Sequence, residues 1–159
     1  NLMIGIRDPH YPDYRDVAVP KKAADLTKCK NTTKDKTGNK CPTSTDTGWY
    51  IKLNKSQKVT AEPTVSSGLV YFPIYQPSSS VNKCSLGDAF ICAVDDECGT
   101  NASSRLGAFK NKNDTCKYVG QGVLSRIVIF ANKLFANIAG QSTGSKKDLV
   151  ILDLSLIHI

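Results

Sequence analysis

Short stretches in which large apolar and polar residues alternate dominate the chain. A period of two is typical of a β-strand with one buried face, whereas an amphipathic helix repeats every three to four residues. The stretches are rich in β-branched and aromatic residues and are bounded by Gly, Pro, Ser and Asn, which favours strands. We expect an all-β fold with strands at 2–6, 48–53, 59–65, 69–75, 88–95, 125–130, 134–138 and 147–153, and long loops at 7–47 and 98–120.

The order of these strands recurs along the chain. Val70-Tyr71-Phe72 matches Leu134-Phe135-Ala136, and the closing strand ends in aspartate both times, at Asp95 and Asp153. A repeat of about 60 residues with three or four short strands is typical of β-propeller blades. A propeller closes with about 4–8 blades, so the pattern predicts a partial propeller of about two to three blades of antiparallel strands. The expected segments are a blade end at 1–53, a full blade at 54–120, a partial blade at 121–153 and an unassigned tail at 154–159.

One part of the repeat is also compatible with a helix. The apolar residues between 123 and 138 fit a helical stripe as well as a pair of strands. We favour strands, because many of these residues are β-branched or aromatic and because the repeat requires strands there. A short helical turn is expected within 16–30.

The positive charge of the chain is concentrated in one segment. The net charge is +7, and the segment 21–40 holds seven lysines and two aspartates. It contains no arginine and no aromatic residue, whereas nucleic-acid-binding surfaces combine basic and stacking side chains. We expect no nucleic-acid partner and interpret the segment as a solvated loop that can contact an acidic partner. Its lysines are Lys21, Lys22, Lys28, Lys30, Lys34, Lys36 and Lys40.

The chain also lacks an apolar run of the ~20 residues that a membrane-spanning helix needs. The most apolar stretch, 123–139, is interrupted by Arg126 and Lys133. We therefore expect no transmembrane segment in this chain.

Six cysteines suggest the redox compartment. None forms a C-x-x-C pair, and the two histidines are distant in sequence, which argues against a zinc site. An even number of cysteines in polar loops predicts disulfides and an oxidising compartment; reduced cysteines in a cytosolic protein are the alternative. Sequence does not fix the pairing, but closing the two polar loops locally would pair Cys29 with Cys41 and Cys98 with Cys116. The disulfide candidates are Cys29, Cys41, Cys84, Cys92, Cys98 and Cys116, with Cys84 and Cys92 left for each other.

Residue clusters that could support catalysis or metal binding are sparse. His10 lies near Asp8 and Asp13, but no G-x-S-x-G nucleophile elbow or phosphate-binding loop accompanies it. Asp95-Asp96-Glu97 offers carboxylates to a cation, yet contiguous acidic residues are also typical of a polar turn. We expect no enzymatic activity, no catalytic residues, no metal site and no cofactor.

A series of motifs resembles one known family. They are Gly48-Trp49-Tyr50-Ile51-Lys52-Leu53, Val59-Thr60-Ala61-Glu62-Pro63-Thr64-Val65, Gly68-Leu69-Val70-Tyr71-Phe72, Pro77-Ser78-Ser79, Cys84-Ser85 and the strand from Ala89 to Asp95. Together they resemble the C-terminal β-propeller of the PilY/PilC type IV pilus biogenesis and tip-adhesin family. In that family G-W-Y-x-x-L, D/E-P-x-V and G-x-V-x-F strands precede a P-S-S…C-S loop and a strand ending in A-x-D. Ile4-Gly5-Ile6-Arg7-Asp8 is similar to the family's Y-G-I-x-D strand end.

The resemblance covers most of 4–153 and is most specific at 48–99. It implies a non-enzymatic propeller scaffold for type IV pilus assembly and surface adhesion. The implied location is extracytoplasmic, at the cell surface or pilus tip and associated with the outer membrane. The implied partners are pilin, other pilus components, or a host or abiotic surface.

The chain lacks one motif of the PilY/PilC family, and one alternative function shares the same strand pattern. The family's calcium loop, D-x-D-x-D-x-x-x-D, has no counterpart here, because Asp8, Asp13 and Asp16 are too far apart, so no calcium site is expected in this chain. The alternative function is a blade segment of a quinoprotein-type propeller dehydrogenase. A single tryptophan and the absence of adjacent cysteines argue against that alternative.

Overall fold

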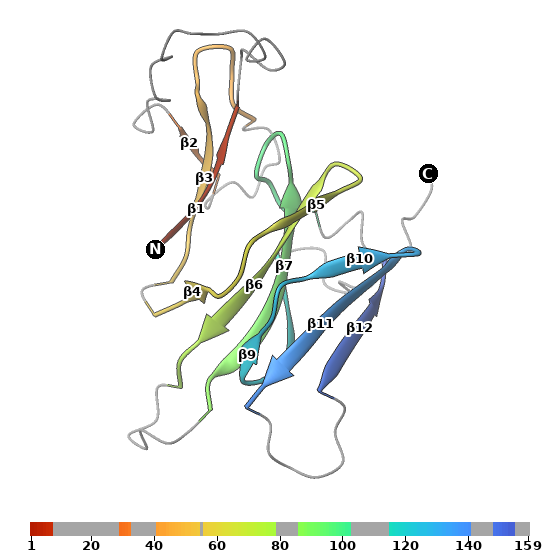
Figure 1. Cartoon of the computed structure of the whole chain (residues 1–159). Coiled ribbons are helices and arrows are strands. Elements are labelled where there is room, and N and C mark those ends of the chain that lie inside the picture. The colour runs from red at the N-terminus through yellow and green to blue at the C-terminus, as the bar shows by residue number, and fades with distance from the viewer. Residues whose placement is uncertain are drawn as a thin grey trace, which may run out of the picture. The chain divides into compact units, whose positions relative to one another are not determined.

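The computed structural model describes residues 1–7, 29–32, 41–54, 56–78, 86–102, 115–140 and 148–154. Within these ranges every regular element is a strand, and the strands form three sheets (Figure 1). The all-β expectation is confirmed. The chain divides into two compact units: Leu2–Lys52 with Glu97–Thr100, and Asn1 with Leu53–Asp96 and Asn101–Ile159.

The smaller unit contains a three-stranded sheet in the order β1-β3-β2. β1 (Leu2–Ile6) pairs antiparallel with β3 (Gly48–Lys52), and β2 (Lys30–Asn31) pairs parallel with β3. Trp49 is buried in this unit, and a Cβ at Gly5 or Gly99 would overlap its indole ring. Both glycines are therefore needed for the tryptophan to pack.

The larger unit begins with a five-stranded sheet, here called the first sheet. Its strands are β4 (Lys58–Val59), β5 (Thr64–Ser66), β6 (Leu69–Gln76), β7 (Asp88–Asp95) and β8 (Cys116–Gln121), in the order β4-β6-β7-β8 with β5 also on β6. β6 is a nearly continuous apolar run, and its residues are buried on both faces. Such runs are typical of strands covered on two sides.

The second sheet of the larger unit has four strands. They are β9 (Val123–Leu124), β10 (Val128–Phe130), β11 (Lys133–Ala139) and β12 (Leu149–Asp153), in the order β10-β11-β12 with β9 also on β11. β11 alternates strictly: Leu134, Ala136 and Ile138 are buried, whereas Lys133 and Asn137 are exposed. This alternation is what a sheet with one covered face requires.

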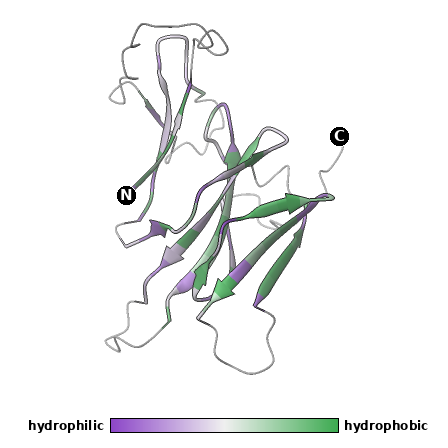
Figure 2. Cartoon of the chain, viewed as in Figure 1, coloured by the Kyte–Doolittle hydropathy of each residue, from purple (hydrophilic) through white to green (hydrophobic). Residues whose placement is uncertain are grey.

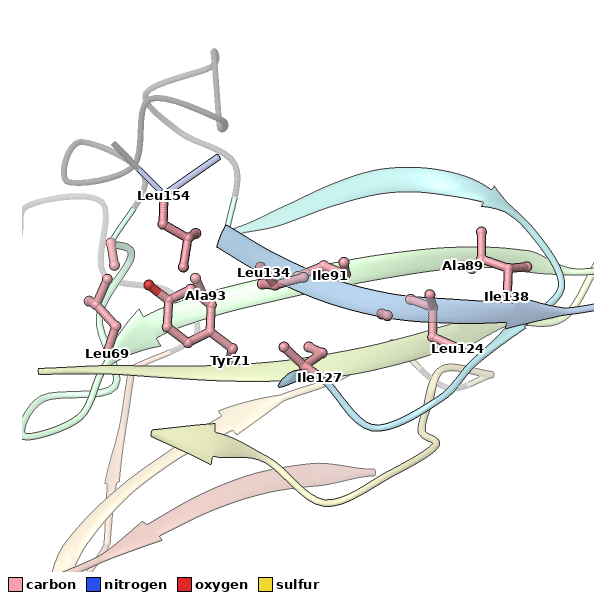
Figure 3. Close-up of a cluster of buried hydrophobic side chains, with 12 residues drawn as sticks. Leu69, Tyr71, Ala89, Ile91, Ala93, Leu124, Ile127, Leu134, Ile138 and Leu154 are labelled. Atoms are coloured by element: carbon pink, nitrogen blue, oxygen red, sulfur yellow. The ribbon is translucent and has the colours of Figure 1, made fainter. Parts of the chain in front are cut away.

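The core of the larger unit lies between these two sheets, where their facing side chains interdigitate (Figure 3). Each sheet contributes every second residue of its central strands, as the pleat dictates. The first sheet supplies Leu69, Tyr71, Ala89, Ile91 and Ala93, and the second supplies Leu124, Leu134, Ala136 and Ile138, with Ala102, Ile127 and Leu154 completing the cluster.

Polar side chains also join the two sheets along one edge. Thr60 Oγ1 donates a hydrogen bond to the carbonyl of Leu124 at 3.2 Å, and Thr64 Oγ1 donates to the carbonyl of Ile127 at 2.6 Å. Thr60 directly follows β4 and Thr64 is the first residue of β5, so the segment from β4 to β5 runs beside residues 124–127. Its exposed Glu62 forms an ion pair of 3.1 Å with Arg126.

The two sheets repeat one topology in one register. β5 and β6 join through Ser67 and Gly68, and β10 and β11 through Ala131 and Asn132; all four have positive φ, as type I′ hairpin turns require. The backbone pairings also correspond, as shown by the rows Thr64–Tyr71–Ala93 and Val128–Phe135–Ile151.

Hydrogen bonds outside the ladders repeat as well. Asp96 N donates to Gly68 O as Leu154 N donates to Asn132 O. The matched triplets of the sequence therefore occupy equivalent positions, and so do Asp95 and Asp153.

Several strand boundaries differ from expectation. The helical alternative for 123–138 is wrong, since this segment forms β9, β10 and most of β11. The strand expected at 59–65 is interrupted between β4 and β5, where Pro63 offers no N–H to a ladder. β8 begins inside the expected loop 98–120, and β2 lies inside the expected loop 7–47. Most of the expected helical turn at 16–30 lies outside the described residues.

Candidate binding surface

The described disulfides differ from the expected pairing. Cys41 bonds to Cys98, and Cys92 bonds to Cys116, so the pairs Cys29–Cys41, Cys98–Cys116 and Cys84–Cys92 are wrong. The expectation joined cysteines that are close in sequence. The fold instead places Cys92 opposite Cys116 in the β7–β8 ladder. It also places Glu97–Thr100 in the same unit as Cys41.

The two remaining cysteines have different outcomes. Cys29 is buried and, among the described cysteines, is the one outside a disulfide. Its Sγ lies 3.5 Å from Thr47 Oγ1. Cys84 lies outside the described residues.

The predicted contact loop is described only in part. Lys30 lies in β2, and its Nζ donates a hydrogen bond to the carbonyl of Cys41 at 3.2 Å. That side chain therefore contributes to the local fold of the smaller unit. The other six lysines of the loop, Lys21, Lys22, Lys28, Lys34, Lys36 and Lys40, lie outside the described residues.

No metal-binding cluster occurs in the part of the chain that the structure describes. Within it, no group of three His, Cys, Asp or Glu side chains could hold a metal ion. Asp95, Asp96 and Glu97 belong to the described residues, so they do not form such a group. The other candidates from the sequence lie outside the described ranges: Asp8, His10, Asp13 and Asp16.

Among the described acidic residues, Asp46 is the one whose carboxyl has a clearly lowered pKa. Hydrogen bonds from the Thr43 backbone N–H (2.7 Å) and hydroxyl (2.9 Å) hold the pKa of its carboxyl below the usual value. Lys30 and Arg7 lower this pKa further through their charges. The carboxylate is exposed and closes the turn before β3, so we assign it a structural role.

The most distinctive surface of the described chain is one that sequence reasoning did not single out. The face of the second sheet that points away from the core carries five large apolar side chains, and we call it the outer face. Figure 2 shows the hydrophobic character of β10 and β12. The residues are Val128, Phe130, Phe135, Leu149 and Ile151, with Phe130 73% and Val128 56% exposed.

Strand register gathers these side chains into a patch. Val128, Phe135 and Ile151 lie side by side in one row across three strands. Polar groups share the two flanking rows with the remaining apolar ones: Lys133 and Asp153, with Nζ and Oδ1 3.9 Å apart, lie in the row of Phe130, and Asn137 lies in the row of Leu149. An apolar centre with a polar rim is the usual composition of a binding surface.

The two disulfides indicate that the chain folds in an oxidising, extracytoplasmic compartment. The described residues include no helix with the length and apolar character needed to cross a membrane. Comparisons with protein-family models, with curated proteins and with solved structures found no match to this chain.

Proposed function

We propose that this chain is a non-enzymatic scaffold segment of a surface protein that acts in type IV pilus assembly and adhesion. The observation that supports the proposal best is the repeated sheet: two antiparallel sheets with the same register and hairpin turns pack face to face. Repetition of such sheets is the building principle of a propeller. The motif series at 48–99 supplies the link to the PilY/PilC family.

In this proposal the segments keep the roles assigned from the sequence. Residues 54–120 and 121–153 are a full blade and a partial blade, and 1–53 is the end of a preceding blade. The cross-strand disulfide Cys92–Cys116 stiffens the first of the two sheets. Rigid sheets that present loops are well suited to binding, because recognition residues concentrate on loops held by a scaffold. The lysine loop 21–40 is the proposed contact for an acidic partner such as pilin or a surface.

Deleting the gene in the source organism tests the assignment. We expect loss of surface pili, twitching and adhesion, with recovery on complementation by the unaltered gene. Normal piliation, twitching and adhesion in the deletion strain would contradict the proposal. An absorbance band of a bound quinone in the purified full-length protein would instead favour the dehydrogenase alternative.

A second comparison tests the lysine loop. Complementation with Lys21, Lys22, Lys28, Lys34, Lys36 and Lys40 changed to Gln should weaken adhesion and reduce its dependence on salt. The charge-matched control changes six lysines elsewhere in the chain to Gln, which should leave adhesion close to normal; they are Lys55, Lys83, Lys110, Lys112, Lys146 and Lys147. Equal effects of the two sets would show that general charge, and not this loop, determines binding.

A further inference from the structure

The outer face of the second sheet carries large apolar side chains where a sheet face in contact with water usually carries polar ones. Phe130, Val128, Ile151 and Leu149 are 73%, 56%, 50% and 44% exposed, and Phe135 lies among them. Scattered apolar residues on a surface need no explanation, but a contiguous apolar patch rimmed by polar groups marks an interaction site. The question is which occupant this face fits.

The register of the two sheets identifies the counterpart of the outer face. Tyr71 in the first sheet is equivalent to Phe135 in the second, because each is the third residue after its hairpin turn and lies in a matching row. By the same pairing, Ala93 corresponds to Ile151, and Ile91 to Leu149. Tyr71, Ala93 and Ile91 all belong to the core between the sheets. The outer face is thus the equivalent of a face that is already packed against a sheet.

The partner of that packed face is known from the same core. It is the face of the second sheet that carries Leu134, Ala136 and Ile138. The equivalent residues of the first sheet lie on the side of that sheet that faces away from this core, and they are also buried: Val70, Phe72 and Ile74. The two sheets therefore pack in the same sense, front of one on back of the next. A head-to-tail contact of this kind is heterologous, so it leaves a free front face that fits another back face.

We infer that the outer face binds a third antiparallel sheet of the same repeat, which presents small and branched aliphatic side chains as Leu134, Ala136 and Ile138 do. The inference rests on the proposed scaffold function, since a scaffold of repeated sheets requires successive sheets to pack. The interface between the first two sheets would then continue at the third. Its composition differs at several positions: Thr64, which donates to Ile127 O, is replaced by Val128, and the buried Leu69 is replaced by Lys133. The third contact accordingly lacks the threonine hydrogen bond of the first and has Lys133 at its border.

A chain with one added repeat tests this inference. Residues 97–154 are duplicated directly after Leu154, in place of 155–159, because Leu154 is the equivalent of Asp96 in the repeated hydrogen bond. In the added copy Cys98→Ser and Cys116→Ser prevent new disulfides. Phe130→Ser and Phe135→Tyr introduce the residue types of the equivalent positions Ser66 and Tyr71, which makes the two copies distinguishable by mass. Hydroxyl-radical footprinting then reports the exposure of the original Phe130 and Phe135.

We expect oxidation of the original Phe130 and Phe135 to fall severalfold relative to the natural chain. Leu134→Ser with Ile138→Ser in the added copy should restore the oxidation, whereas Asn137→Ser in the copy, on the other face of the strand, should not. Unchanged oxidation of both phenylalanines would overturn the inference, whether or not the added copy folds. A natural chain that already dimerises, and becomes monomeric with Phe130→Ser, would overturn it in favour of a second copy. Neither readout involves pili, so the pilus assignment can fail while this inference stands.

Discussion

The two sheets of the larger unit share a topology but differ in what covers them. In the first sheet both faces of β6 and β7 are buried, including Val70 and Phe72 on one side and Tyr71 and Ile91 on the other. In the second sheet only the face with Leu134 is buried, and Val128 and Phe130 are exposed. Equivalent backbone positions therefore experience different environments. The difference shows that the repeat specifies strand pairing, whereas burial depends on the neighbour of each sheet.

The residue types of the second sheet match its one-sided burial only in part. β11 alternates between buried and exposed positions as a one-sided sheet should, yet its outer neighbours in β10 and β12 are as apolar as the residues of a buried strand. A sheet whose outer face had adapted to water would carry polar residues there. Substitutions at equivalent positions can measure this contrast directly.

The largest expected effect compares Ile91→Ala with Leu149→Ala, which occupy equivalent positions. Ile91 is fully buried between the sheets, so its truncation should lower the free energy of unfolding by about 2–5 kcal/mol. Leu149 is 44% exposed, so the same truncation should cost less than about 1 kcal/mol. Urea denaturation of both variants measures the two losses. Equal losses would contradict the contrast and would mean that the outer face is covered in solution.

The next effect concerns the disulfide of the first sheet. Removing it with Cys92→Ala and Cys116→Ala should lower the free energy of unfolding by about 3 kcal/mol, because the bond closes a loop with a sequence separation of 24 in the unfolded chain. The control is Val150→Ala at the equivalent of Cys92, which shortens a side chain but removes no cross-link. Its loss should be well below that of the cysteine variant. A cysteine variant as stable as the natural chain would show that strand pairing alone holds β8.

A smaller effect is expected at the threonine that joins the sheets. Thr64→Val removes the hydrogen bond to Ile127 O and should lower the free energy of unfolding by about 1 kcal/mol. The reverse substitution, Val128→Thr, places a hydroxyl at the equivalent exposed position and should change it by less than about 0.5 kcal/mol. Thermal denaturation of the two variants compares them. A larger loss at Val128 than at Thr64 would reverse the assignment of the packed and outer faces.

The sequence predicted strands well where the apolar pattern was long and uninterrupted. The strand expected at 88–95 coincides with β7, and the expected 69–75 is nearly all of β6. β8 was missed because Lys117, Gly120 and Gln121 give it little apolar alternation, and because its pairing depends on β7. Local composition carries little information on such a strand, since edge positions depend on context.

Features that depend on three-dimensional pairing could not be predicted from spacing. The disulfides depend on which strands are paired and on which segments share a unit. Cys92 therefore bonds to Cys116, its partner in the β7–β8 ladder, and not to Cys84. The outer face was missed for a related reason. Val128 and Phe130 look like core residues in the sequence, and only the position of the neighbouring sheet shows which of the two faces is covered.

The smallest effect is expected at the ion pair between Glu62 and Arg126. The two groups are 3.1 Å apart but both side chains are mostly exposed, so a double-mutant cycle with Glu62→Gln and Arg126→Gln should give a coupling between 0 and about 1 kcal/mol. Raising the salt to ~1 M should abolish most of it, because screening then acts over about 3 Å. The longer pair Lys133–Asp153, which borders the outer face, should couple even less. A coupling that persists in high salt would mean that the edge between the sheets excludes water. A coupling that disappears would leave the apolar contacts and the threonine hydrogen bonds as the interactions that hold the two sheets together.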